Sequence, residues 1–270
     1  MVQAMNLSVN DAKILNAVFD PESAPETPKI TIDPLLPADC NITNFSLLTA
    51  LRAQELSAIR LVEAYNPAED SPTHKHVVYL KALHIISGLI ADHPTYASAY
   101  NNRAQLRRWR FGDRDVLVGS QGNDIARSAI GDAVRDLAMA ITLASPVPGV
   151  YAVSPAQGKL LAQAWTQKAA VYWGAAKDLE AEPRVFGKEW EGWDKTRFEE
   201  EGSRCFFMAG VFGSEVGKAM AVVSNPHARL CGSIVKEAMR RERFLGVVVA
   251  IKICEVENIS RAAYRVACGA

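Results

Sequence analysis

The most constraining feature of this sequence is a run of apolar residues at three- and four-residue steps through most of the chain. From Phe45 onward the spacing is clear, as in Ile59, Val62 and Tyr65. This is the period of an α-helix that buries one face. Alternation of apolar and polar residues, which would indicate strands, is suggested only over 247–254. The sequence therefore predicts an all-α fold.

The helical segments also repeat one another. In a stacked helix pair, small residues let the two helices approach closely, and large apolar residues fill the space between neighbouring pairs. Three copies of a pair of about 34 residues follow in series. The residues at the shared positions are Ala82, Ile86 and Leu89, then Tyr100, Ala104, Ala133, Leu137 and Ala140, then Trp165, Ala169, Tyr172, Phe206, Ala209 and Phe212. The spacing is similar to the tetratricopeptide repeat and predicts a right-handed superhelix of about three helix pairs. An irregular helical bundle is the alternative.

Two segments are distinctive, namely Ala97-Ser-Ala-Tyr-Asn-Asn-Arg-Ala-Gln105 and Asn225-Pro-His-Ala-Arg-Leu-Cys-Gly232. They resemble the tetratricopeptide repeat protein 36 family, and specifically a fungal-type member. The resemblance covers about residues 8–243. Two insertions separate the helices of the second and third repeats, at residues 114–130 and about 174–196. They look like helix extensions plus loops. The resemblance implies a small helical adaptor that binds proteins, a heat-shock chaperone among them, and a link to tyrosine metabolism.

Three regions follow from these patterns. Residues 1–44 should hold a helix at about 8–19 and a proline-rich extended linker whose apolar side chains lie along a surface. Residues 45–243 should form the tetratricopeptide repeat domain, with helices at about 214–223 and 226–243 covering its last pair. Residues 244–270 form an atypical tail that matches nothing in the family.

Composition excludes several classes of protein. The 30 basic and 30 acidic residues balance, which argues against a nucleic-acid partner and against binding to a membrane surface. The five cysteines lack metal-binding or disulfide-framework spacing, so we expect mostly buried thiols in a reducing compartment. The opening residues do not resemble a secretory signal. We expect a cytoplasmic protein, with a nuclear location also compatible.

Motifs for catalysis are sparse, and we expect a protein that is not an enzyme and holds no cofactor or metal. The glycines of 210–218 do not match a phosphate-binding loop, because Phe212 stands where its first glycine belongs and Ala219 replaces the hydroxyl residue. Gly213 is better interpreted as the end of a helix, with Ser214 starting the next. His74 and His76 are assigned to a solvated loop before a helix at 76–92, and Cys205 and Cys231 to apolar helix faces. The alternatives are an enzyme whose site is assembled from dispersed residues, and an architectural subunit.

The concave surface of the predicted superhelix is the candidate binding site. Amide side chains there can pair with a peptide backbone, and arginine and tryptophan can grip a carboxylate and an apolar side chain. Trp109 could instead turn into the core, and the whole face could simply be solvated. The predicted groove residues are Asn101, Asn102, Gln105, Arg108, Trp109, Gln163, Gln167 and Trp173.

One specific mode of chaperone binding can be tested on the sequence. Repeat proteins that clamp the C-terminal carboxylate of a chaperone use lysine, asparagine and arginine at five fixed positions. Only Asn102 fits, because the other four positions hold Glu55, Ile59, Gln163 and Gln167. Glu55 would repel a carboxylate. We expect the partner to be another protein or peptide. If it is a chaperone, it would have to bind by a different mode.

Overall fold

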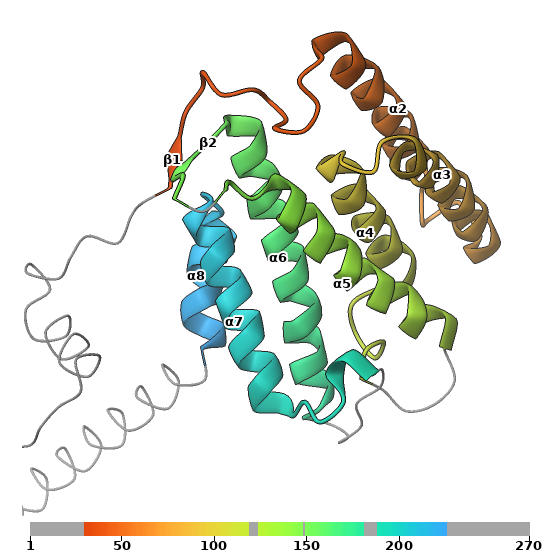
Figure 1. Ribbon diagram of the computed structural model, residues 1–270. Helices are drawn as coiled ribbons and strands as arrows, with labels where there is room; N and C mark the ends of the chain where they lie inside the picture. The colour runs from red at the N-terminus through yellow and green to blue at the C-terminus, as the bar shows by residue number, and fades with distance from the viewer. Residues whose placement is uncertain (1–29, 119–123, 148, 181–187, 226–270) are drawn as a thin grey trace, which may run out of the picture.

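The computed structural model describes residues 30–118, 124–147, 149–180 and 188–225 (Figure 1). The helices expected at 8–19 and 226–243, and the tail from residue 244, lie outside these residues. Cys231 lies outside them as well.

The described residues form seven α-helices, a short 3-10 turn and two very short strands. The helices run in three pairs followed by one further helix, which confirms the all-α fold predicted from the periodicity. Their bounds are α2 (Phe45–Glu63), α3 (Pro72–Asp92), α4 (Ala97–Phe111), α5 (Asp124–Ala144), α6 (Pro155–Asp178), α7 (Lys195–Val211) and α8 (Glu215–Ser224). The strands are β1 (Thr31–Ile32) and β2 (Ala152–Val153), and the 3-10 turn is Lys188–Trp190.

Each helix packs against the next one in the chain, so the pairs α2–α3, α4–α5 and α6–α7 stack in sequence order, and α8 follows against α7 (Figure 1). In addition, α4 contacts α6. The first helices of the three pairs thus approach one another along one side of the array. The fold is a helical repeat array, as expected for tetratricopeptide repeats.

The residues that defined the repeats form part of the core. Ala82, Ala104, Ala133, Ala169 and Ala209 are all fully buried at their helix contacts. Most large residues of the pattern are buried with them in three apolar clusters, which occupy the α2–α4, α4–α6 and α5–α7 spaces, whereas Tyr100 and Trp165 are partly buried against these clusters. The residues that the spacing identified therefore contribute to the hydrophobic burial that stabilises the array.

Two helix boundaries show how local sequence sets the elements. The helix expected to begin at residue 76 begins at Pro72, because Ser71 accepts a hydrogen bond from the backbone N–H of His74 and proline suits the first turn. His74 therefore lies on α3 and not in a loop. Gly213 ends α7 with a φ of +95°, and Ser214 caps α8, as expected.

The insertion after α4 is more than a helix extension. Val116, Leu117 and Val118 are buried in the apolar cluster between α5, α6 and α7. Asp178, at the end of α6, accepts a hydrogen bond from the backbone N–H of Asp115. The insertion thus contributes to the core, although α5 and α6 do extend to Asp124 and Asp178 as predicted.

The linker before α2 crosses the array. β1 pairs in parallel with β2, and the backbone N–H groups of Thr31 and Asp33 donate to the carbonyl oxygens of Tyr151 and Val153 at 2.7 and 2.9 Å. Further along, the Asn41 amide donates to the carbonyl of Leu143 at the end of α5. The linker lies along a surface, as expected, but Leu35 is fully exposed.

Candidate functional site

Two cavities lie side by side along the first helices of the pairs. The first cavity has a volume of about 440 Å³ and lies between α2, α3, α4 and α6. The second cavity, of about 410 Å³, lies between α4, α6 and α8. Both are lined by Gln105, Lys159 and Gln163, so together they form one continuous groove.

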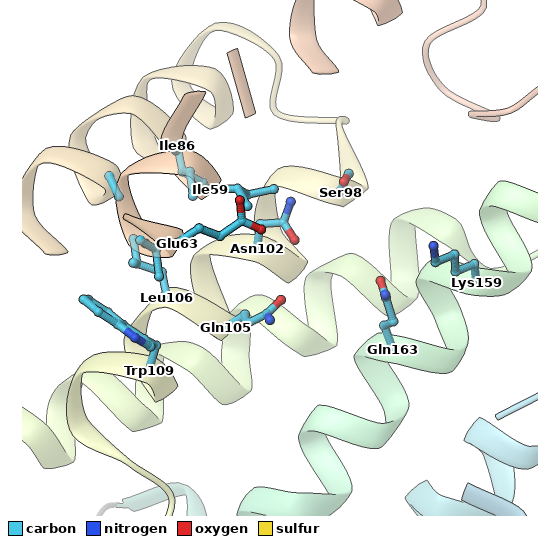
Figure 2. Close-up of a pocket in the computed structure, with 13 residues that line it drawn as sticks. Ile59, Glu63, Ile86, Ser98, Asn102, Gln105, Leu106, Trp109, Lys159 and Gln163 are labelled. Atoms are coloured by element: carbon cyan, nitrogen blue, oxygen red, sulfur yellow. The ribbon is translucent and has the colours of Figure 1, made fainter. Parts of the chain in front are cut away.

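The first cavity is mainly apolar on the side of α2 and α3. Its apolar lining is Ala58, Ile59, Val62, Ala82, Ile86, Leu106 and Trp109. Figure 2 shows Ile59, Ile86, Leu106 and Trp109 gathered on this side, whereas Lys159 and Gln163 approach from α6. The polar lining of this cavity is Glu63, Ser98, Asn102, Gln105, Lys159 and Gln163.

Trp109 is held at one end of the first cavity by its neighbours. Its ring meets the ring of Tyr65 edge-on at 5.5 Å, and the Lys75 ammonium lies 4.9 Å from the ring centroid. The indole is half-buried against the α2–α4 cluster and lines the cavity with its remaining surface. Trp109 therefore takes part in both the core and the groove.

Most of the residues that line the second cavity carry polar side chains. Arg108, Thr166, Gln167 and Ser214 line it with the three shared residues, and Ala162 and Val216 supply its apolar surface. The Arg108 guanidinium makes two hydrogen bonds to the Asp113 carboxylate, at 2.7 and 2.6 Å, and a third to Gln167 Oε1 at 3.1 Å. Most of the hydrogen-bonding nitrogens of Arg108 are therefore already engaged within the chain.

A chain of side-chain hydrogen bonds continues from Arg108 through the three first helices. Gln167 Nε2 of α6 donates to Asn101 Oδ1 at 2.9 Å, and the Asn101 amide donates to Asn102 Oδ1 at 3.3 Å. Asn102 Nδ2 donates to Glu55 Oε1 of α2 at 2.8 Å, and the Tyr96 hydroxyl donates to Glu55 Oε2 at the same distance. We call this series, from Asp113 to Tyr96, the amide chain. Its buried polar groups satisfy one another and link α2, α4 and α6.

Glu55 is the buried acid of the amide chain. Burial raises the pKa of its carboxyl group above the ordinary glutamate value, against the opposing effect of hydrogen bonds from Ser98, Tyr96 and Asn102. Burial, and then the neighbouring Glu55, raise the pKa of the Tyr96 phenol. Glu55 faces its partners inside the array and lines neither cavity.

The structure places six of the eight predicted groove residues on the groove. Asn102, Gln105, Trp109 and Gln163 line the first cavity, and Arg108 and Gln167 line the second. Asn101 is buried in the amide chain, and Trp173 packs on the α5–α7 cluster beneath the Lys177 ammonium. These two side chains lie on neither cavity.

Val62, Glu63 and Lys159 also line the groove but were not among the predicted groove residues. Val62 and Glu63 follow Ile59 by one helical turn on α2, which was a usable signal for the same face. Lys159 lies before the part of α6 that matches the repeat, so the pattern carried no information about it.

The described residues offer little for catalysis or metal binding. Among them, no group of three or more histidine, cysteine or acidic side chains could hold a metal ion. His74 Nδ1 pairs with Asp70 Oδ1 at 2.6 Å on the surface. Burial raises the pKa of the Cys205 thiol to about 11, as expected of a core cysteine, whereas Cys40 is exposed. None of the helices in the described part of the chain is long and apolar enough to span a membrane.

Comparison with known proteins agrees with the repeat architecture. The chain matches no protein-family model and no solved structure. It is 34% identical to the L-tyrosine degradation gene cluster protein hmgX of Aspergillus fumigatus, over 88% of this chain and 93% of that protein. It is 26% identical to tetratricopeptide repeat protein 36 of Danio rerio, over 87% of this chain and 95% of the fish protein. With the stacked helix pairs and the buried repeat positions, these matches show that the chain belongs to the tetratricopeptide repeat protein 36 family.

Proposed function

We propose that this chain is a non-enzymatic adaptor that binds a segment of a partner protein in the groove. The observation that carries this proposal is the first cavity, where apolar side chains and Trp109 stand open beside the amides of Asn102, Gln105 and Gln163. Apolar and aromatic surface supplies affinity, and amides can pair with a peptide backbone. This combination suits an extended segment that inserts an apolar side chain.

The names of the relatives suggest the process. One relative is named as a protein of an L-tyrosine degradation gene cluster, so we propose that the adaptor acts in tyrosine breakdown by binding a protein of that pathway. We place this action in the cytoplasm, with the nucleus as a second location. A heat-shock chaperone is a further candidate partner, but Glu55 is buried and Asn102 is bonded to it, which does not favour a carboxylate clamp.

The ionisable groups of the groove favour an adaptor over an enzyme. Arg108 is engaged by Asp113, and the two remaining charged residues of the cavities, Glu63 and Lys159, lie exposed on different helices. Acid–base catalysis usually requires ionisable groups held close together in a pocket that shifts their pKa values. The buried carboxyl group of Glu55 is turned into the amide chain and away from both cavities.

Affinity capture with paired tryptophan variants tests the proposal. The wild-type chain and Trp109→Ala and Trp173→Ala variants would be used as baits in extract from cells grown on tyrosine, and bound proteins quantified by mass spectrometry. Trp173 is a matched control because it is also half-buried and lies under a lysine, yet lines neither cavity. We expect a tyrosine-pathway protein to be captured by the wild type and Trp173→Ala and lost from Trp109→Ala. Equal capture by all three folded baits would contradict binding in the groove.

A further inference from the structure

Two cationic side chains that line neither cavity come together where α3 packs against α4. The Lys75 ammonium of α3 lies 4.9 Å from the centroid of the Trp109 ring of α4. One turn further along α3, the Tyr79 ring meets the Phe111 ring edge-on, with the centroids 5.5 Å apart. Arg110 stands between Trp109 and Phe111 in α4, and its guanidinium lies 5.2 Å from the Phe111 centroid. These contacts place Lys75 and Arg110 at the same meeting point of the two helices.

These two cations have no acidic partner in the described part of the chain. Neither Lys75 nor Arg110 forms an ion pair with a residue of the described ranges. The Arg110 Nε is buried and has no hydrogen-bond partner there. Asp132, on the neighbouring α5, pairs instead with Arg107 and Arg135. The described residues therefore contribute two positive charges at this point and no anion to balance them.

The two charges also act on each other. Burial, and then the nearby Arg110 guanidinium, lower the pKa of the Lys75 ammonium. The carboxylate of Asp70, in the loop before α3, is already paired with His74. Half-buried like charges raise the free energy of the folded state unless an anion lies between them. A bound anion would therefore stabilise this part of the array.

We propose that Lys75 and Arg110 form a site for an anionic oxygen group, the carboxylate or phosphate of a side chain in the partner segment. The planar guanidinium fits the oxygens of either group, and the lysine adds a point charge. Trp109 contacts Lys75 and also lines the first cavity, so the site adjoins the groove. This inference rests on the proposed groove function and names a charged group that the partner should carry.

NMR titration of the full chain with sodium phosphate and with sodium acetate tests the site, at fixed pH and at an ionic strength held constant with chloride. The signals followed are the Arg110 Nε–H and the Trp109 indole N–H. We expect both signals to shift and to saturate. Arg110→Gln and Lys75→Gln, followed at Trp109, should each weaken anion binding by about tenfold, because hydrogen bonds to charged groups are among the strong ones.

The two anions distinguish the two sources of the group. Much tighter binding of phosphate than of acetate would assign the site to a phosphorylated side chain, and similar binding of both would assign it to an acidic one. Shifts that grow linearly without saturating, or that persist unchanged in both variants, would overturn the proposal.

Trp173 is the matched control for the titration. The Lys177 ammonium lies 5.0 Å from its ring centroid, much as Lys75 lies on Trp109, but Lys177 already has an acidic partner in Glu180 at 3.5 Å. The Trp173 indole signal should therefore stay in place, and an equal shift of both indoles would show a general effect of the salt and contradict the site.

Partner capture links the site to the groove. Lys75→Gln and Arg110→Gln baits, checked for folding by thermal unfolding, should retain less of the protein that the wild type captures. Full retention by both would contradict the assignment of the site to the partner. Loss of capture by Trp109→Ala together with full retention by these two variants would overturn this inference and leave the groove function standing.

Discussion

The first cavity is lined by apolar side chains of α2 and α3 and by Trp109, whereas most residues that line the second cavity are polar, and Arg108, Thr166 and Gln167 among them already bond within the chain. In the first, Ile59, Val62 and Trp109 keep surface open to the groove. In the second, Arg108 and Gln167 are held by Asp113 and Asn101. The difference indicates a division of roles between the two halves of the groove. The first half, around the first cavity, offers contact surface to a ligand. The second half, around the second cavity, holds the helices in place.

The largest effect, a loss of stability, is expected from a substitution at Gly174 of α6, which packs against the segment that holds Asp113. A Cβ added there would meet the backbone oxygen of Asp113 at 2.6 Å, so alanine must push the segment after α4 away from α6. This would disturb both the Asp113–Arg108 pair and the buried Val116–Val118 segment. We expect Gly174→Ala to lower the free energy of unfolding by about 1–3 kcal/mol, measured by urea denaturation.

Gly88→Ala on α3 is the matched control, because a Cβ there has nothing within 4 Å. This variant should gain about 0.5–1 kcal/mol from the better helix propensity of alanine. A Gly174→Ala variant as stable as Gly88→Ala would mean that the segment after α4 can move without cost.

The next test compares the two halves directly through Trp109 and Arg108. Trp109→Ala should weaken partner binding by about 2 kcal/mol, as for an aromatic anchor. Arg108→Ala should instead lower stability by about 1–2 kcal/mol, because Asp113 and Gln167 lose a charged partner, and should change affinity much less. Calorimetric binding and thermal unfolding of both variants check this. An equal loss of affinity in both, with folding intact, would remove the distinction between the halves.

The smallest effect on stability is expected at Glu55, the buried acid on α2 in the amide chain. Its folded-state pKa is raised by burial, so the folded chain retains the proton more strongly than the unfolded chain does. Stability should therefore fall as pH rises from the ordinary glutamate pKa through the raised value. Glu55→Gln removes this titration but keeps an oxygen that can accept from Asn102. The stability of the variant relative to the wild type should increase with pH in denaturation series, and a parallel pH dependence of both proteins would contradict the role of Glu55.

Much of the helical core could be predicted from sequence because it depends on spacing. Ala82, Ala133 and Ala209 are buried where the repeat pattern places small residues, since helical period alone decides which face they occupy. The pairing of β1 with β2 could not be predicted, because two residues on each side give no detectable period. The burial of Val116–Val118 was also missed, although three successive apolar residues in an insertion were a usable signal.

The groove was predicted less completely because it depends on partners from other helices. The pattern placed Asn101 and Arg108 near the concave side, but their bonds to Gln167 and Asp113 follow from how α4 sits against α6 and the segment after it. Trp173 shows the same limit: its repeat position indicated the groove, whereas the structure packs it on the α5–α7 cluster. Which side of the helix a residue occupies can be inferred from sequence, but what it contacts there depends on the tertiary arrangement.

The pairing of β1 with β2 has a consequence for how the chain unfolds. A stack of repeats ordinarily interacts only with its nearest neighbours, so its end units can fray independently of the middle. Here the chain just before the first pair bonds to the chain just before the third, between residues 120 positions apart. This contact skips the middle pair and ties the first and third units together. Loss of either terminal unit therefore also breaks this contact, so the array should melt in a single cooperative transition more readily than an untied stack of equal length.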